Sequence, residues 1–345
     1  MVVKVSKPAL NLREKLSELS KPSGVAGEAM LRAETPQEQF NLIGAGRRNM
    51  LINANMTINQ RGTANPVSIS ANDNSVYPVD RWRTYGNSNA TTATINDVVL
   101  PNGHRVKSLK TVAGGTGAWL HPYQTVEIES WMAGQTVTLS AWIRTNFTNQ
   151  AFRICDGAAC SLIGDEFPAD GQWHYLSVTH VLPNSPSTTH MQYHPGFGGA
   201  CVANDYIEFA CPQMELGKVA TPFEYRQIAE ELAACQRYFQ IYGGATSEHF
   251  AGGVMSTNRL NLIKQFPVTM RAAPSLSATL YGGAWSNWNV YWGSGTATVT
   301  GTNESYSSIS SISIGVLHGG SSTMGGAGYI YANNTNARLS FNAEL

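Results

Sequence analysis

Short runs of β-type residues, each bounded by turn residues, recur along most of this 345-residue chain. In TVTLSAWIR, one side of the run carries Val137, Leu139, Ala141 and Ile143, as in a half-buried antiparallel strand. Further runs of strand length lie between Gly, Asn, Pro or Asp residues, at 98–100, 105–112, 174–182 and 205–216. Strands do not alternate regularly with helices. The sequence therefore predicts a mainly β protein with a jelly-roll or β-sandwich domain, and disfavours a doubly wound sheet.

The composition suits many short strands joined by tight turns. Charged residues make up 13% of the chain and glycines number 33, which disfavours a mainly helical enzyme. The 23 basic and 23 acidic residues cancel, so attraction to nucleic acid or to an anionic bilayer is poorly supported. No apolar run approaches the roughly 20 residues of a membrane span. We expect neither nucleic acid nor a membrane as partner, and we expect no secretory signal at the N-terminus.

Five cysteines lack the CxxC spacing that is typical of metal sites. Cys155 and Cys160 could bridge a hairpin, and Cys201 could pair with Cys211. The alternative, which we favour, is that the cysteines are buried thiols in a reducing compartment.

Residues 1–48 differ in composition from the rest of the chain. Leu12, Leu16 and Leu19 have the i, i+4, i+7 spacing of a short amphipathic helix, and a second helix start is predicted with Thr35 as its N-cap. Helices this short bury too little apolar surface to be stable alone. The segment therefore either docks on a partner or is a disordered leader.

One charged block, QMELGKVATPFEYRQIAEELAACQRYFQ, interrupts the charge-poor strands at 213–240. It predicts a linking helix over 223–240, with Thr221 as N-cap, Glu224 in a capping box and Glu231 on the wet face. The apolar stripe of this helix comprises Ile228, Leu232, Cys235 and Phe239. Such a helix either folds back on its own sandwich or packs against copies of itself around a symmetry axis. We predict the second arrangement, with the stripe as an oligomer interface.

After residue 240 only seven formal charges remain, and several runs again have strand length. The ending GYIYANNTNARLSFNAEL predicts a terminal hairpin over NNTN at 333–336. A second small β-sandwich is therefore expected. The predicted organisation is a segment over 1–48, a jelly roll over 49–222, the linking helix over 223–240 and a C-terminal β-domain over 241–345.

Catalytic motifs such as GxxxxGK[ST] and GxSxG are absent from the sequence. His190 and His194 are four residues apart, but the surrounding sequence has loop character, which disfavours a metal site. Neighbouring carboxylates on one strand or turn are more often solvated than catalytic. Two such pairs are present, Glu127 with Glu129 and Asp165 with Glu166. We predict a protein that is not an enzyme and needs no metal or cofactor.

Aromatic residues beside Gly- and Asn-rich turns are better functional candidates. Sugar rings stack on Trp and Tyr while polar side chains bind the sugar hydroxyls. The predicted glycan-binding residues are Trp119, His121 and Tyr123 in GTGAWLHPYQ, and Trp285 and Trp288 in GGAWSNWNVYWG. Packing at an oligomer interface is the alternative for the second cluster. Trp82 and Trp173 are predicted to be packing residues.

Several segments occur in an order that is similar to a known family. They are RRNMLINANMTINQRG, VYPVDRW, VTLSAWIRT, GQWHYLSVTHVLP, the block at 213–240, FPVTMRAAPSLS and LSFNAEL. Together they resemble the fibre-like structural proteins of tailed bacteriophages, which carry a carbohydrate-binding-module-like jelly roll followed by a small C-terminal β-domain. The matches span 47–345, and ATPFEYR…CQRYF is the most specific. Family members often read LLINGAM where this chain has MLINANM, so Ala54 replaces a turn glycine and a small local change is expected.

The resemblance implies a homotrimeric appendage of a virion, on the tail or capsid, that is assembled in the host cytoplasm and contacts host-surface polysaccharide. The leader looks like the attachment end of such fibres. The resemblance implies that the leader contacts other virion proteins, through Leu12, Leu16, Leu19 and Phe40. Two alternatives stay open, a glycan-degrading tail enzyme and a purely structural capsid decoration protein.

Overall fold

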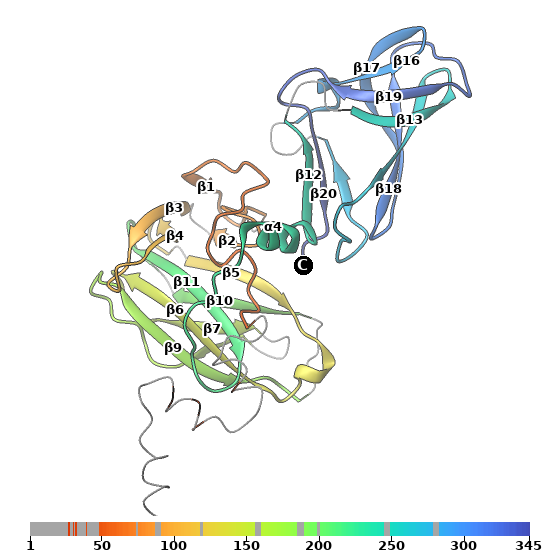
Figure 1. The fold of residues 1–345 in the computed structure, drawn as a ribbon. Coiled ribbons are helices and arrows are strands. Elements are labelled where there is room, and N and C mark those ends of the chain that lie inside the picture. The colour runs from red at the N-terminus through yellow and green to blue at the C-terminus, as the bar shows by residue number, and fades with distance from the viewer. Residues whose placement is uncertain are drawn as a thin grey trace, which may run out of the picture.

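The computed structural model describes residues 48–73, 75–86, 91–117, 120–155, 160–184, 190–198, 201–244, 249–278 and 283–345, together with Gly27, Met30, Arg32 and Gln39. The mainly β class predicted from the sequence is confirmed (Figure 1). The predictions for the N-terminal segment lie outside the described residues, namely Leu12, Leu16, Leu19, Thr35 and Phe40.

Two stacked antiparallel sheets form the first part of the chain. The six-stranded sheet has the order β1-β3-β4-β11-β6-β9, and the five-stranded sheet has the order β2-β5-β10-β7-β8. The strands are β1 (Val67–Ile69), β2 (Arg83–Gly86), β3 (Thr91–Val99), β4 (Arg105–Ala113), β5 (Leu120–Glu127), β6 (Thr136–Thr145), β7 (Gln150–Cys155), β8 (Cys160–Ile163), β9 (His174–Val181), β10 (His190–Gly198) and β11 (Tyr206–Leu216). Strands consecutive in sequence often belong to opposite sheets, which is the connectivity of a jelly roll.

The core of this jelly roll lies between the two sheets. Trp82 is fully buried there, 5.1 Å from the ring of Phe209 and 6.3 Å from that of Tyr193. The prediction that Trp82 is a packing residue is therefore confirmed. The apolar side of β6 also faces this core, as the alternation predicted, through Val137, Leu139, Ala141 and Ile143.

The segment that contains Ala54 runs beside this core. Ala54 is buried, and the left-handed backbone conformations fall on its neighbours Asn53 (φ 55°) and Met56 (φ 56°). The Asn53 side chain donates hydrogen bonds to the carbonyls of Ile58 and Asp80, both at 2.8 Å. An alanine therefore fits at position 54 without the backbone freedom of glycine.

The charged block forms a helix that is shorter than predicted. Helix α4 (Ile228–Gln236) begins after Gln227, so the predicted N-cap Thr221 and capping-box Glu224 lie outside it. The Thr221 hydroxyl instead donates to the buried carboxylate of Glu215 at 2.7 Å. Glu224 accepts the backbone N–H of Arg48 at 2.9 Å. The Thr221 side chain is thus used by Glu215 and the Glu224 side chain by Arg48, so neither caps the helix.

The apolar stripe predicted for the linking helix is divided between the chain's own core and solvent, and its last residue, Phe239, lies on β12 and not on α4. Cys235 and Phe239 are buried within the chain, Leu232 is half-buried and Ile228 is 66% exposed. Glu231, predicted on the wet face, is buried and accepts the backbone N–H of Asn53 at 2.5 Å. The helix therefore folds back on its own sandwich. The prediction of a stripe open to sibling chains is wrong for Cys235 and Phe239.

A closed barrel and a small sheet form the second part, where the sequence predicted a second sandwich. The barrel has the order β13-β14-β18-β17-β16-β19, and the sheet has the order β12-β20-β15. The strands are β12 (Phe239–Gly243), β13 (His249–Ser256), β14 (Arg259–Gln265), β15 (Ser275–Ser277), β16 (Trp288–Trp292), β17 (Gly295–Ser307), β18 (Ser311–His318), β19 (Ala327–Ala332) and β20 (Arg338–Asn342). A closed barrel leaves no unpaired strand edge, which strand-length patterns alone do not show.

The predicted terminal hairpin over NNTN is wrong. β19 pairs with β13 and β16 of the barrel, whereas β20 pairs with β12 and β15 of the small sheet. The turn therefore joins two different sheets.

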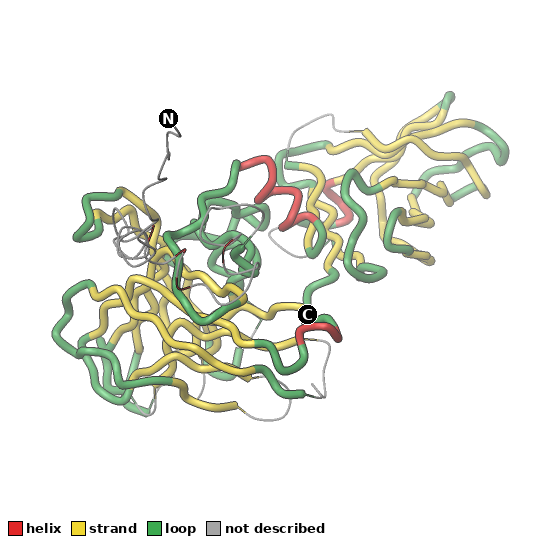
Figure 2. The backbone as a smooth tube through the Cα atoms, turned by 60° about the horizontal axis from the view of Figure 1, so that its bottom comes forward, coloured by secondary structure: helices red, strands yellow, loops and turns green. Residues whose placement is uncertain are grey.

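A buried ion cluster joins the two parts, and we call it the junction cluster. It consists of Arg61, Asp80, Arg81 and Glu344. Arg61 contacts Asp80 and Glu344, each at 2.8 Å, and Glu344 also pairs with Arg81. The two views agree that the C-terminus lies between the parts (Figures 1 and 2). The last residues of the chain are thus tied to the jelly roll.

The cysteines show both of the alternatives left open. Cys155 and Cys160 form a disulfide across the β7–β8 hairpin, so the favoured thiol state is wrong for this pair. Cys201 and Cys211 are buried thiols that are not joined by a disulfide, and Cys235 is also a buried thiol. Burial raises the pKa of the Cys201 and Cys211 thiols to about 11.

None of the helices in the described part of the chain has the length and apolar character needed to cross a membrane.

Candidate functional site

The structure separates the predicted glycan-binding residues. Trp119 lies outside the described residues. Trp288 is fully buried in the barrel core, 5.5 Å from the ring of Phe250, so the prediction of a sugar platform is wrong for it. Trp285 is half-buried against the same core. Alternation along β16 turns Trp288 inward, because every second side chain of a barrel strand faces the interior.

His121 and Tyr123 lie on β5 with their rings close to His194 of β10. Tyr123 stacks on His194 at 5.2 Å, and His121 is 6.1 Å from it. His194 therefore lies on a strand, where the sequence indicated a loop. Only 9% of His121 and 6% of Tyr123 is exposed. The two residues therefore present little ring surface to a ligand, which does not agree with their predicted role as an accessible glycan-binding surface.

Burial also sets the charge of these histidines. It lowers the pKa of His121 to about 3, and the nearby Arg153 guanidinium acts in the same direction. Burial likewise holds the pKa of His194 well below its usual value, with His121 and Arg153 adding to the effect. Both rings are therefore neutral near pH 7 and belong to the packing of the sheet.

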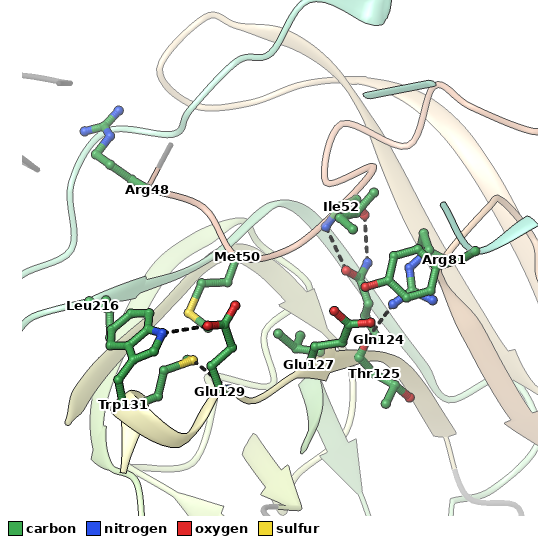
Figure 3. Close-up of a pocket in the computed structure, with 13 residues that line it drawn as sticks. Arg48, Met50, Ile52, Arg81, Gln124, Thr125, Glu127, Glu129, Trp131 and Leu216 are labelled. Atoms are coloured by element: carbon green, nitrogen blue, oxygen red, sulfur yellow. Dashed lines mark hydrogen bonds between the residues drawn. The ribbon is translucent and has the colours of Figure 1, made fainter. Parts of the chain in front are cut away.

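The best candidate site is a cleft beside Trp131, at the junction of the two parts (Figure 3). It has a volume of about 320 Å³. Trp131 belongs to the short 3-10 helix η1 (Ser130–Met132) between β5 and β6, and it is 58% exposed. An exposed tryptophan at the edge of a cleft is uncommon in a packed domain and is a typical ligand contact. We call this site the Trp131 cleft.

The Trp131 ring is held in place by its own turn. Its Nε1 donates to the Glu129 carboxylate at 2.8 Å (Figure 3). The Met132 sulfur accepts the Glu129 backbone N–H at 3.4 Å and packs into the jelly-roll core. Because the ring is oriented before any ligand arrives, binding costs less conformational entropy.

The floor of the cleft is also rigid. The Gln124 side chain accepts the Ile52 backbone N–H and donates to the Ile52 carbonyl, both at 2.7 Å. Gln124 is buried, so this pair fixes the irregular segment before β1 to strand β5. The floor thus keeps its shape without a ligand.

The charged residues of the cleft are paired with other groups of the protein. Glu127 accepts from Arg237 at 3.0 Å. Arg81 lies 3.5 Å from the Tyr238 ring and donates to the Thr125 carbonyl at 2.5 Å. Arg48 donates to the Thr221 hydroxyl at 2.9 Å. These contacts hold the segment before α4, and the two residues that follow α4, against the jelly roll around the cleft.

This arrangement can bind a sugar ring. The exposed face of Trp131 offers an apolar platform, and the carboxylates of Glu127 and Glu129 can accept hydrogen bonds from hydroxyl groups at its edge. The sequence analysis missed Trp131 as a site residue. The available signal was the segment VEIESW, in which glutamates at alternate positions are followed by a tryptophan two residues after the second glutamate.

The carboxylate pairs singled out in the sequence are placed as follows. Glu127 is engaged by Arg237 and Glu129 by Trp131, while Asp165 and Glu166 are exposed in the turn after β8. Within the described ranges, no three His, Cys, Asp or Glu residues are grouped so that they could hold a metal ion.

No family model matches this sequence, and no curated protein matches it. Among solved structures, the chain is similar to the CBM22-1 xylan-binding domain of Xyn10C from Paenibacillus barcinonensis, at 15% identity over 46% of this chain and 99% of that one, with a TM-score of 0.30. It is similar to TmCBM61 in complex with β-1,4-galactotriose, at 13% identity over 50% of this chain and 100% of that one, with a TM-score of 0.31.

A third similar structure is the enzymatically active domain of tailspike protein 4 of bacteriophage CBA120. The identity is 15% over 49% of this chain and the TM-score is 0.32. The match covers 21% of that chain. These likenesses concern the fold alone.

Proposed function

We propose that this protein is a non-enzymatic appendage of a bacteriophage virion that contacts a glycan through the Trp131 cleft. The observation that carries the glycan part is the exposed Trp131 ring, which is fixed by Glu129 and bordered by a rigid cleft. A tryptophan held in this way offers a preorganised platform to a sugar ring.

The virion part of the proposal is supported by the resemblance of the sequence over 47–345 to fibre-like phage proteins. The homotrimer rests on the same resemblance and not on the predicted stripe, because Cys235 and Phe239 are buried inside their own chain. Three weak glycan sites on one trimer would bind a polysaccharide far more tightly than one site. Light scattering of the full chain tests the assembly, and the mass of one chain would contradict it.

The glycan part is tested by the substitution Trp131→Ala in the full chain. Isothermal titration against a panel of soluble oligosaccharides should show an affinity about tenfold weaker than that of the unaltered protein. Trp131→Phe keeps an aromatic platform and should retain most of the binding. Tyr306→Ala removes a 69% exposed aromatic ring of the second part, so it is the matched control and should bind like the unaltered protein.

Two results would count against the proposal. Equal binding by the Trp131→Ala variant and the unaltered protein would show that the Trp131 cleft is not the glycan-binding site. Release of reducing ends from the host polysaccharide would contradict the non-enzymatic assignment and favour a glycan-degrading tail enzyme.

A further inference from the structure

A second, separate groove lies on the outer face of the six-stranded sheet. It has a volume of about 510 Å³ and runs between strands β6 and β9 and the segment 220–225. Its aromatic residues are Trp142, Tyr175, Phe223 and Tyr225. None of the residues that line the Trp131 cleft takes part in it. We call it the Tyr225 groove.

One wall of the Tyr225 groove is built by the strand register. Trp142 of β6 lies opposite Tyr175 of β9, and their ring centroids are 5.5 Å apart. Since Ala141 and Ile143 point into the core, Trp142 between them points outward. Tyr175 is 44% exposed, so this aromatic pair presents ring surface to solvent.

The opposite wall is built by the segment before α4. Phe223 and Tyr225 meet edge to face at 4.9 Å, and Tyr225 is 57% exposed. Phe223 also packs on the small apolar cluster of the outer sheet face, which includes Ala210 and Leu100. Tyr225 is thereby held out from the surface by a packed neighbour.

Buried polar contacts keep this second wall in place. The Thr221 backbone N–H donates to Glu215 at 2.8 Å, and its hydroxyl donates to the same carboxylate at 2.7 Å. The Glu224 backbone N–H donates to the Gln213 side chain at 2.9 Å. These bonds span the residues on either side of Phe223, so the wall is rigid.

The chemistry of the groove is aromatic and uncharged. Among the described residues that line it, none is Asp, Glu, Lys or Arg. Its polar groups include the side chains of Asn102, His104 and Ser140 and the hydroxyls of Tyr175 and Tyr225. Two aromatic walls with uncharged hydrogen-bonding groups match a ring that has apolar faces and a hydroxylated edge. An acidic sugar would find no Lys or Arg side chain among the described lining residues to pair with its carboxylate, which is costly in a partly buried site.

We propose that the Tyr225 groove is a second glycan-binding site, specific for a neutral pyranose and independent of the Trp131 cleft. The two sites use different strands and different aromatic residues, so each chain can hold a polysaccharide at two points. Once one site has bound the polysaccharide, the second site meets it at a high effective concentration. The overall affinity for the polysaccharide therefore rises without any additional contact at either site.

The test titrates the full chain with a neutral oligosaccharide, either maltotetraose or cellotetraose, and with tetragalacturonate as the acidic probe. Tyr225→Ala should weaken the neutral ligand at one site about tenfold or more. Tyr225→Phe keeps the ring and should bind like the unaltered protein. Tyr306→Ala removes a 69% exposed tyrosine of the second part and is the matched control. Thermal unfolding verifies that each variant is folded.

The Trp131→Ala variant separates this inference from the proposed function. In that variant the groove should still bind the neutral tetrasaccharide, and tetragalacturonate should not compete. Loss of all binding in Trp131→Ala would overturn the second site and leave the cleft proposal intact. Unchanged glycan binding by the Trp131→Ala variant, together with loss of binding by the Tyr225→Ala variant, would support the Tyr225 groove as a glycan-binding site and refute the Trp131 cleft as one. Equal affinity of the groove for tetragalacturonate would overturn its neutral specificity.

Discussion

The junction cluster predicts that one carboxylate near the C-terminus stabilises the contact between the two parts. The Glu344 side chain is 3% exposed and accepts from Arg61 at 2.8 Å and from Arg81. Glu344→Gln keeps the shape of the side chain but removes its charge. The two guanidinium groups then share a buried site with Asp80 as their remaining carboxylate in the cluster.

The expected magnitude follows from what each arginine retains. Breaking a buried ion pair by removing one partner costs about 3–5 kcal/mol. Arg61 keeps Asp80 at 2.8 Å and lies between the rings of Tyr77 and Phe239. Arg81 keeps the Thr125 carbonyl and the Tyr238 ring. These remaining contacts place the loss in the free energy of unfolding near the lower limit, at about 3 kcal/mol.

The pH dependence provides a second measurement of the same pair. Burial alone would raise the pKa of Glu344, but the charges of Arg81 and Arg61 outweigh it and hold the pKa below its ordinary value of 4.5. The carboxylate therefore contributes stability above its unfolded-state pKa, and this contribution is lost as the pH falls through the folded-state pKa. Glu344→Gln should remove this part of the acid destabilisation.

Urea unfolding followed by tryptophan fluorescence at pH 7 and in the acid range measures both effects. Glu166→Gln, an exposed carboxylate in the turn after β8, is the matched control and should change the free energy by less than about 0.5 kcal/mol. A Glu344→Gln variant that unfolds like this control at pH 7 would refute the reasoning.

Two further predictions concern the helix stripe and the N-terminal segment. Phe239→Ala should cost about 3–5 kcal/mol in the free energy of unfolding because its ring is buried, whereas Ile228→Ala at the 66% exposed end should cost less than about 0.5 kcal/mol; equal losses in urea titrations would contradict the division of the stripe. Deletion of residues 1–47 should leave both β-rich parts folded, since Arg48 itself binds the segment before α4 through the Glu224 carboxylate and the Thr221 hydroxyl. Circular dichroism checks the fold, failure to join the particle is the expected phenotype, and unfolding of the truncated chain would contradict the prediction.

Local patterns in the sequence predicted features that depend on neighbouring residues. The alternation along β6 placed its apolar side correctly, and Trp82 is a packing residue as expected. The spacing of Cys155 and Cys160 allowed the hairpin disulfide that the structure contains. Each of these features is set by a side-chain period of two or by a short turn, both of which can be read within a few residues.

Contacts between distant residues decided the features that the sequence analysis predicted wrongly. Glu224 has the local signature of a capping box, yet it accepts the backbone N–H of Arg48, which is 176 residues away in the sequence, and the helix begins at Ile228. The sequence around Trp288 is typical of a sugar-binding loop, yet closure of the barrel places the Trp288 side chain in the core. A local signal cannot show which distant group will satisfy a side chain or cover it.

The sequence by itself determined the mainly β class, the jelly-roll pattern of the first part and a helix within the charged block. Tertiary structure alone decided that the second part closes into a barrel, that Cys235 and Phe239 are buried in their own chain, and that Trp131 is left exposed beside the junction. The physical reason is that periodicity specifies which side of a strand is apolar, whereas exposure depends on what the rest of the chain packs against that side.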